Sequence, residues 1–208
     1  MRFKIKNAVM PLLIANVIAF FIQLLIPGFT ESFMLIGADV FTRPWILLTS
    51  MFLHGGFAHL FFNMYVLFMF GSLLESRIGT KKFLIIYFLS GILASFGSSF
   101  IYPRALGASG AIYGLLGAMI IMLPELRVAP LFIPIPMKLW QALLFFAFLD
   151  LFIFSGIAVA AHAIGAVTGL LYSLTIKKQR VSYYNKDFST KSHLEAEDID
   201  EYFRKGRF

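Results

Sequence analysis

The stretch GGFAHLFFNMYVLFMFGSLL occupies residues 55–74 and contains no charged side chain. About twenty apolar residues in an α-helix cross the roughly 30 Å hydrocarbon core of a bilayer. The stretch therefore predicts a membrane-spanning helix that ends where Glu75 follows it. Its two strongly polar residues, His59 and Asn63, are one helical turn apart and so share one face of that helix.

The composition of the whole chain extends this interpretation. Of its 208 residues, 59% are hydrophobic and 14% are charged, whereas soluble domains carry about 25% charged residues. The sequence thus predicts an all-α polytopic membrane protein with six transmembrane helices in residues 1–176 and a polar cytosolic tail in 177–208. The six expected spans are 8–27, 55–74, 83–102, 108–123, 138–154 and 157–176. The first is longer than the apolar core of a secretion signal and lacks a small-residue cleavage site, so we expect it to be retained.

The basic residues indicate how the helices are oriented. The net charge of +7 is spread over loops and chain ends, which does not suggest a nucleic-acid partner. If the N-terminus is cytoplasmic, only Arg43 and Arg104 fall outside. The cytoplasmic side holds the C-terminal tail and these basic residues of the remaining segments: Arg2, Lys4, Lys6, Arg77, Lys81, Lys82, Arg127 and Lys138. Basic residues favour the cytoplasmic side, so we expect a multi-pass cell-membrane protein with both termini cytoplasmic.

Three of the expected helices carry polar residues at one depth. The fourth span has 16 residues and covers about 24 Å, so its outer end lies below the membrane surface and places Ser109 there. His162 lies about 7 Å into the sixth span, and His59 and Asn63 lie near the outer end of the second. Polar residues inside a bilayer are costly and often functional. The sequence therefore predicts a polar site in the outer leaflet.

Small residues accompany two members of this layer. Gly110 and Gly114 follow Ser109 with the spacing GxxxG, and Gly165 and Gly169 follow His162 with the same spacing. Such faces let membrane helices approach closely. Generic helix packing explains a single GxxxG equally well, but its recurrence beside both polar residues favours contact between the fourth and sixth helices.

The layer has the residue types that nucleophilic catalysis needs. A serine hydroxyl requires a neighbouring base to take its proton, and His162 could take the proton of Ser109. An oxyanion needs fixed donors, which the helix N-terminus at Ser109 and the side chains of His59 and Asn63 could supply. The chain has no cysteine, which excludes disulfides, thiolate metal sites and a cysteine nucleophile. No cofactor or metal is predicted.

Three motifs in the chain resemble those of the rhomboid family of intramembrane serine proteases. Gly107-Ala-Ser109-Gly resembles its G-x-S-G motif and His59-Leu-Phe-Phe-Asn63 its H-x-x-x-N motif. The stretch HAIGAVTG, which begins at His162, resembles its H-x-x-G-x-x-x-G motif. The resemblance covers about residues 8–176, and three ordered motifs on separate helices are more specific than any one of them. It implies a six-helix bundle that cleaves transmembrane protein substrates near the outer membrane face, at small residues.

The resemblance also implies roles for individual residues. Ser109 would be the nucleophile and His162 the general base, without a required acid, and His59, Asn63 and the Ser109 backbone N–H would hold the oxyanion. Tyr113 is similar to an aromatic residue that packs on the catalytic imidazole. Further residues with family counterparts are Gly107, His54 and Glu75, the last as a structural anchor on the inner side. One departure is the order Arg43-Pro44-Trp45, where the family often has Trp-Arg.

Two alternatives remain at this point. A catalytically silent rhomboid-like protein would bind membrane clients without cutting them, although such relatives lack the Ser–His pair. A transporter or metal site would use His54, His59 and His162, with Asp150 as the only nearby carboxylate. Asp150 could also be a third catalytic residue, but a carboxylate at a helix end explains it better.

Overall fold

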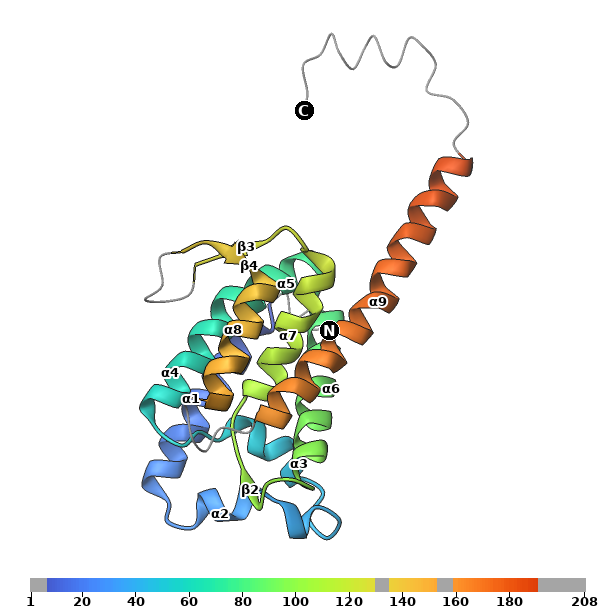
Figure 1. Cartoon of the computed structure of the whole chain (residues 1–208). Coiled ribbons are helices and arrows are strands. Elements are labelled where there is room, and N and C mark those ends of the chain that lie inside the picture. The colour runs from blue at the N-terminus through green and yellow to red at the C-terminus, as the bar shows by residue number, and fades with distance from the viewer. Residues whose placement is uncertain (1–6, 130–134, 153–158, 191–208) are drawn as a thin grey trace. The chain divides into compact units, whose positions relative to one another are not determined.

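The computed structural model describes residues 7–129, 135–152 and 159–190. Its contacts divide the chain into two compact units, Met1–Ser173 and Leu174–Phe208. The main helices are α1 (Val9–Leu25), α4 (Phe57–Val66), α5 (Ser72–Ile78), α6 (Thr80–Ser98), α7 (Ser109–Met122), α8 (Leu139–Phe152) and α9 (Val159–Thr190). Shorter helical elements are α2 (Phe29–Phe33), η1 (Gly37–Asp39), α3 (Ile46–Thr49), η2 (Ser50–Phe52) and η3 (Leu67–Gly71). Figure 1 shows their arrangement.

Helices occupy each of the six stretches in which spans were expected. Three are long and apolar enough to cross a membrane: Phe57–Ile78, which joins α4, η3 and α5, then Thr80–Ser98 and Val159–Ile176. Three more are apolar but shorter, namely Val9–Leu25, Ser109–Met122 and Leu139–Phe148. The chain is thus a helical membrane protein with three candidate spans by length and composition among the described residues.

Some boundaries differ from those expected. The second helix continues past residue 74 to Ile78, and the third begins at Thr80, because Gly79 makes the turn between them with a φ of +82°. Helix α9 continues past 176 to Thr190, since no Pro or Gly interrupts residues 170–190. Part of the expected tail is therefore helical, and its end, 191–208, lies outside the described residues.

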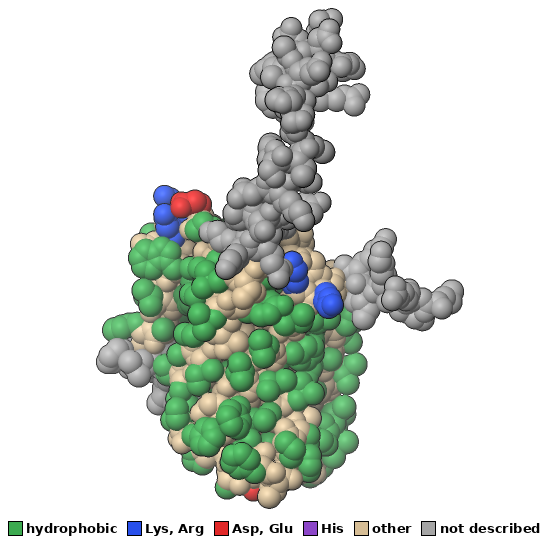
Figure 2. Space-filling model, turned by 90° about the vertical axis from the view of Figure 1, so that its right-hand side faces the viewer, with side chains coloured by type: hydrophobic (Ala, Val, Ile, Leu, Met, Phe, Trp, Pro, Cys, Tyr) green, Lys and Arg blue, Asp and Glu red, His purple; other side chains and the backbone are tan. Residues whose placement is uncertain are grey.

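Helix α7 is the most enclosed of the apolar helices. Nine of its 14 residues are buried, on every side of the helix, and Figure 1 shows it among α4, α6 and α8. Helix α1 instead exposes large apolar side chains such as Ile14, Ile18 and Phe21. Figure 2 shows a face covered by hydrophobic side chains, with charged side chains only towards its two ends. An apolar exterior of this kind suits a lipid solvent.

Two short sheets tie the loops to the helices. β1 (Leu35–Ile36) pairs antiparallel with β2 (Arg104–Ala105), which anchors the loop after α1 to the segment that leads into α7. β3 (Arg127–Val128) pairs antiparallel with β4 (Met137–Lys138) beyond the other end of α7. In the first loop the Arg43 guanidinium lies 5.9 Å from the centre of the Trp45 ring, so an Arg–Trp contact forms despite the altered order of these residues.

A buried carboxylate joins three helices at the end of the bundle away from Ser109. Glu75 is 7% exposed and accepts hydrogen bonds from the backbone N–H groups of Ala8 and Val9, at 2.7 and 3.2 Å. The Thr80 hydroxyl donates a third, at 2.7 Å. The first N–H groups of a helix have no partner within it, so Glu75 caps α1 while it also holds the start of α6.

We expect Glu75→Gln to lower the free energy of unfolding by roughly 2 kcal/mol, because the amide loses one acceptor and the negative charge that strengthens the other bonds. Thermal unfolding in detergent micelles measures the change. Glu31→Gln is the matched control, since Glu31 is exposed on α2. Equal stability of the two variants would contradict an anchoring role for Glu75.

Candidate active site

Ser109 is the first residue of α7. Its position follows from the sequence, because Gly107 breaks the preceding chain and an uninterrupted apolar run begins after it. The N–H groups of the first helical turn lack partners within the helix, and the helix dipole adds partial positive charge there. The Ser109 side chain thus lies where a developing negative charge would be stabilised.

His162 lies against Ser109. The distance between His162 Nε2 and Ser109 Oγ is 2.8 Å, a normal hydrogen bond. The Tyr113 ring, one turn along α7, stacks on the His162 imidazole with 4.1 Å between ring centres and 9° between ring planes. The imidazole is 8% exposed. Its orientation is therefore fixed both by the hydrogen bond and by the stacked ring.

Glycines bring the two helices close enough for this bond. A Cβ atom added to Gly165 would overlap the Gly110 carbonyl, and one added to Gly169 would overlap the Gly114 carbonyl. The glycine face of α9 thus packs against the α7 backbone, as close packing of membrane helices requires, while the Cβ positions of Gly110 and Gly114 face Ala94 and Ser90 of α6. The predicted contact between the fourth and sixth helices is present in the structure.

Gly107 brings the segment before α7 up to His59. Its backbone has a φ of +129°, and a Cβ added there would lie 2.8 Å from His59 Cε1 and 2.9 Å from His59 Nε2. The same position is 3.7 Å from Ser109 Oγ. The Nε2 edge of His59 therefore faces the chain immediately before the serine. The Gly107 N–H donates to the Ser50 carbonyl at 2.9 Å, which fixes this segment.

The two donors expected from α4, His59 and Asn63, differ in their bonds. His59 Nδ1 accepts from the Gly55 N–H at 3.3 Å, so a neutral ring carries its proton on Nε2. The Asn63 amide donates to the His59 carbonyl at 3.0 Å along its own helix. An amide nitrogen has two hydrogens, which leaves a second donor on Asn63.

The His54 side chain packs beside His59. Its ring centre is 5.1 Å from that of His59, and neither ring nitrogen of His54 has a hydrogen-bond partner among the described residues. Burial, helped by the neighbouring His59, lowers the pKa of His54 to about 3. The His54 side chain is therefore neutral at physiological pH.

Gln23 of α1 is a contact that the sequence interpretation missed. Its side-chain amide donates to the His54 carbonyl at 3.3 Å and accepts from the His54 N–H at 2.9 Å. A polar residue inside an otherwise apolar span is a signal that could have singled out Gln23, though not its partner. Asp150, considered as a third catalytic residue, has its side chain outside the described part.

Comparison with known proteins decides the family. The rhomboid domain model matches residues 42–179, which include Ser109, His162, His59 and Asn63. The chain belongs to the rhomboid family. Its rhomboid relatives include YdcA of Bacillus subtilis (strain 168), whose name describes a candidate rhomboid protease, at 38% identity over 67% of this chain and 71% of that protein. They also include mitochondrial rhomboid protein 1 of Saccharomyces cerevisiae, at 32% identity over 84% of this chain.

The lengths of these rhomboid relatives differ. The chain spans 56% of the yeast mitochondrial protein. The rhomboid protease GluP of Bacillus subtilis (strain 168) is 47% identical over 36% of this chain, but the match covers 15% of that protein. The shared region is thus the rhomboid membrane domain rather than the whole of the longer proteins.

The described residues of this rhomboid do not support the metal-site alternative. Among the described residues, no group of three or more His, Asp or Glu side chains could hold a metal ion, and this includes the three histidines of the metal-site alternative.

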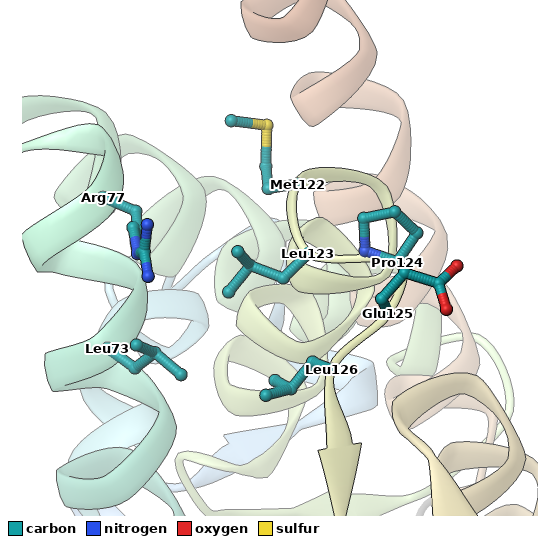
Figure 3. A pocket seen from close by; sticks show the side chains of 7 residues that line it. All are labelled: Leu73, Arg77, Met122, Leu123, Pro124, Glu125 and Leu126. Carbon is teal, nitrogen blue, oxygen red and sulfur yellow. The ribbon is translucent and has the colours of Figure 1, made fainter. Parts of the chain in front are cut away.

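A pocket of about 310 Å³ lies at the far end of α7, lined by Leu73, Arg77, Met122, Leu123, Pro124, Glu125 and Leu126. Figure 3 shows that most of its lining is apolar.

We expect Gly107→Ala to lower the free energy of unfolding by about 1–3 kcal/mol more than Gly28→Ala does. The reason is that the methyl group added at Gly107 would collide with His59, whereas the one added at Gly28 would not. Both glycines have a positive φ, and nothing lies within 4 Å of a Cβ on Gly28. Backbone strain therefore acts in both variants and is greater at Gly107, whose φ of +129° lies further from the left-handed region than the +80° of Gly28, and the collision with His59 adds to it. Thermal unfolding of the two proteins measures the difference, and equal losses would show that His59 does not pack against Gly107.

Proposed function

We propose that this rhomboid is an intramembrane serine endopeptidase that cleaves transmembrane protein substrates near the outer membrane face. Ser109 is the nucleophile and His162 the general base. The observation that carries the proposal is the 2.8 Å hydrogen bond between His162 Nε2 and Ser109 Oγ. A base within hydrogen-bond reach is what activates a serine hydroxyl.

The reaction uses groups already described. His162 Nε2 takes the Ser109 hydroxyl proton while Oγ bonds to the scissile carbonyl carbon. When the tetrahedral intermediate collapses, the C–N bond breaks and the imidazolium returns that proton to the amine leaving group. Water then attacks the acyl-serine with His162 as base again. The C–O bond between the acyl group and Ser109 then breaks, and the imidazolium gives the proton taken from water to Ser109 Oγ, which frees a carboxyl product and restores the serine.

Three donors would hold the oxyanion of each intermediate. They are the His59 Nε2–H, the second hydrogen of the Asn63 amide and the backbone N–H of Ser109. Loss of one such donor costs about 10²–10³ in rate. Stacking of Tyr113 on His162, at 4.1 Å between ring centres, supports a fixed base that does not need a third catalytic carboxylate.

The proposed membrane frame has six spans with both termini cytoplasmic. It is supported by the six apolar helices and by the distribution of basic residues. Ser109 begins a helix of 14 residues, which covers about 21 Å and is shorter than the hydrocarbon core. If the inner end of α7 is at the membrane boundary, Ser109 lies below the outer surface and water reaches it from outside.

We expect Ser109→Ala and His162→Ala each to abolish cleavage of a labelled transmembrane substrate in detergent or liposomes. The double variant should be no worse than either, because residues that act as a unit are not additive. The control is Ser173→Ala, which removes a buried serine bonded to its own helix at Leu170 and should cleave normally. Turnover in Ser109→Ala well above background would refute the proposed nucleophile. Binding of substrate by wild-type protein without any cleavage would favour the client-binding alternative.

The membrane frame is tested by single cysteines, since the natural chain has none. We expect Phe41→Cys and Ser109→Cys to react with a small water-soluble thiol reagent added outside intact cells. Ile121→Cys, near the inner end of α7, should not react, and Ser192→Cys should react only after the membrane is opened. Labelling of Ser192→Cys from outside would show that the orientation is inverted. Labelling of Ile121→Cys but not of Ser109→Cys would remove the proposed outer cavity.

A further inference from the structure

The side-chain amide of Gln23 binds both backbone groups of His54, in the segment that precedes α4, and the Thr30 hydroxyl of α2. It accepts from the His54 N–H at 2.9 Å and donates to the His54 carbonyl at 3.3 Å. Its nitrogen also donates to the Thr30 hydroxyl, at 3.1 Å. A primary amide offers one carbonyl oxygen and two N–H hydrogens, so each of its groups has a partner. The backbone of His54 is thereby held from both sides of the residue.

Gly55, the next residue, connects this restrained backbone to the His59 ring. The Gly55 N–H, directly after His54, donates to His59 Nδ1 at 3.3 Å. A ring that accepts at Nδ1 keeps its proton on Nε2 and cannot turn over without losing the bond. The Nε2 edge is the one that faces Gly107, as the 2.9 Å approach of a Gly107 Cβ to Nε2 indicates.

The connection between His54 and α4 is flexible by composition, although the Gly56 carbonyl accepts from the Leu60 N–H at 3.0 Å. It contains two glycines, Gly55 and Gly56, which lose more conformational entropy on folding than other residues. The neighbouring His54 side chain makes no hydrogen bond among the described residues. The amide of Gln23 therefore holds the peptide group that carries the Gly55 N–H, through the His54 carbonyl of the same group.

We propose that Gln23 is a positioning residue, which holds the Gly55 N–H against His59 so that the His59 Nε2–H points towards Ser109. Gln23 touches no reacting atom and acts through two backbone groups. The link between Gln23 and the His59 ring stands on geometry alone. Its effect on cleavage rests on the proposed function, because only there does the Nε2–H have an oxyanion to stabilise.

The link is tested first without any activity. The chain has four histidines, so ¹⁵N-histidine spectra can be assigned by single His→Ala variants. In wild-type protein we expect His59 to be protonated on Nε2, with its Nδ1 signal shifted by the accepted hydrogen bond. In Gln23→Leu that shift should be lost and the signal broadened. Asn16→Leu also replaces an amide by an alkyl side chain on the same helix. The Asn16 amide donates to the Leu12 carbonyl and interacts with the Tyr87 hydroxyl, so this variant should leave the His59 signals unchanged.

The effect on cleavage is tested by a double-variant cycle. We expect Gln23→Leu to lower the maximal cleavage rate about tenfold, less than outright loss of an oxyanion donor, with little change in KM. In a His59→Ala background the same substitution should have no further effect, whereas general destabilisation would lower the rate in both backgrounds.

The outcomes separate the two proposals. Unchanged His59 signals in Gln23→Leu, or a tenfold loss that persists in the His59→Ala background, would overturn the positioning role while leaving the protease intact. A wild-type protein that does not cleave any transmembrane substrate would overturn the proposed function, and the ¹⁵N spectra would still decide whether Gln23 holds His59.

Discussion

The arrangement of the site depends on the backbone-to-backbone contact between α7 and α9. A Cβ atom on Gly165 would overlap the Gly110 carbonyl and one on Gly169 would overlap the Gly114 carbonyl, so neither glycine of α9 has room for a side chain. Because the two glycine faces begin one residue after Ser109 and three after His162, this contact sets the distance between the two side chains. A methyl group at the crossing would separate the helices and so lengthen a hydrogen bond that joins residues 53 apart in sequence.

Restraints at the two ends of the bundle serve different needs. At the end away from Ser109, the buried Glu75 carboxylate binds the first N–H groups of α1 and the Thr80 hydroxyl, where little water is available to replace it. At the Ser109 end, several hydrogen bonds to backbone groups position the loops around the Ser109–His162 pair. Gln23 holds His54, Gly55 holds His59, and Ser50 holds Gly107. A site on loops gains fixed geometry from such bonds, although its glycines alone would leave it mobile.

The sequence predicts those features that depend on length, apolarity and local breakers. The short α7 with Ser109 at its start follows from Gly107 and an uninterrupted apolar run, and the shared depth of His59, Ser109 and His162 follows from counting along their helices. The end of α9 could not be found in this way. Lysine and arginine end the apolar stretch that indicates a membrane span, but they are good helix formers and do not end the helix. The bonds of Gln23 could not be found either. They join residues 31 apart and depend on how α1 packs against a loop.

The central claim is that Ser109 is an activated nucleophile, and mapping of a covalent adduct tests it most directly. The protein in native-like membranes would be treated with a fluorophosphonate, which reacts with serines activated by a base, and the modified peptide identified by tandem mass spectrometry. The account predicts an adduct on Ser109 alone, at a rate that falls to background when His162 is replaced by alanine. The absence of an adduct on Ser109, or labelling that does not depend on His162, would contradict it.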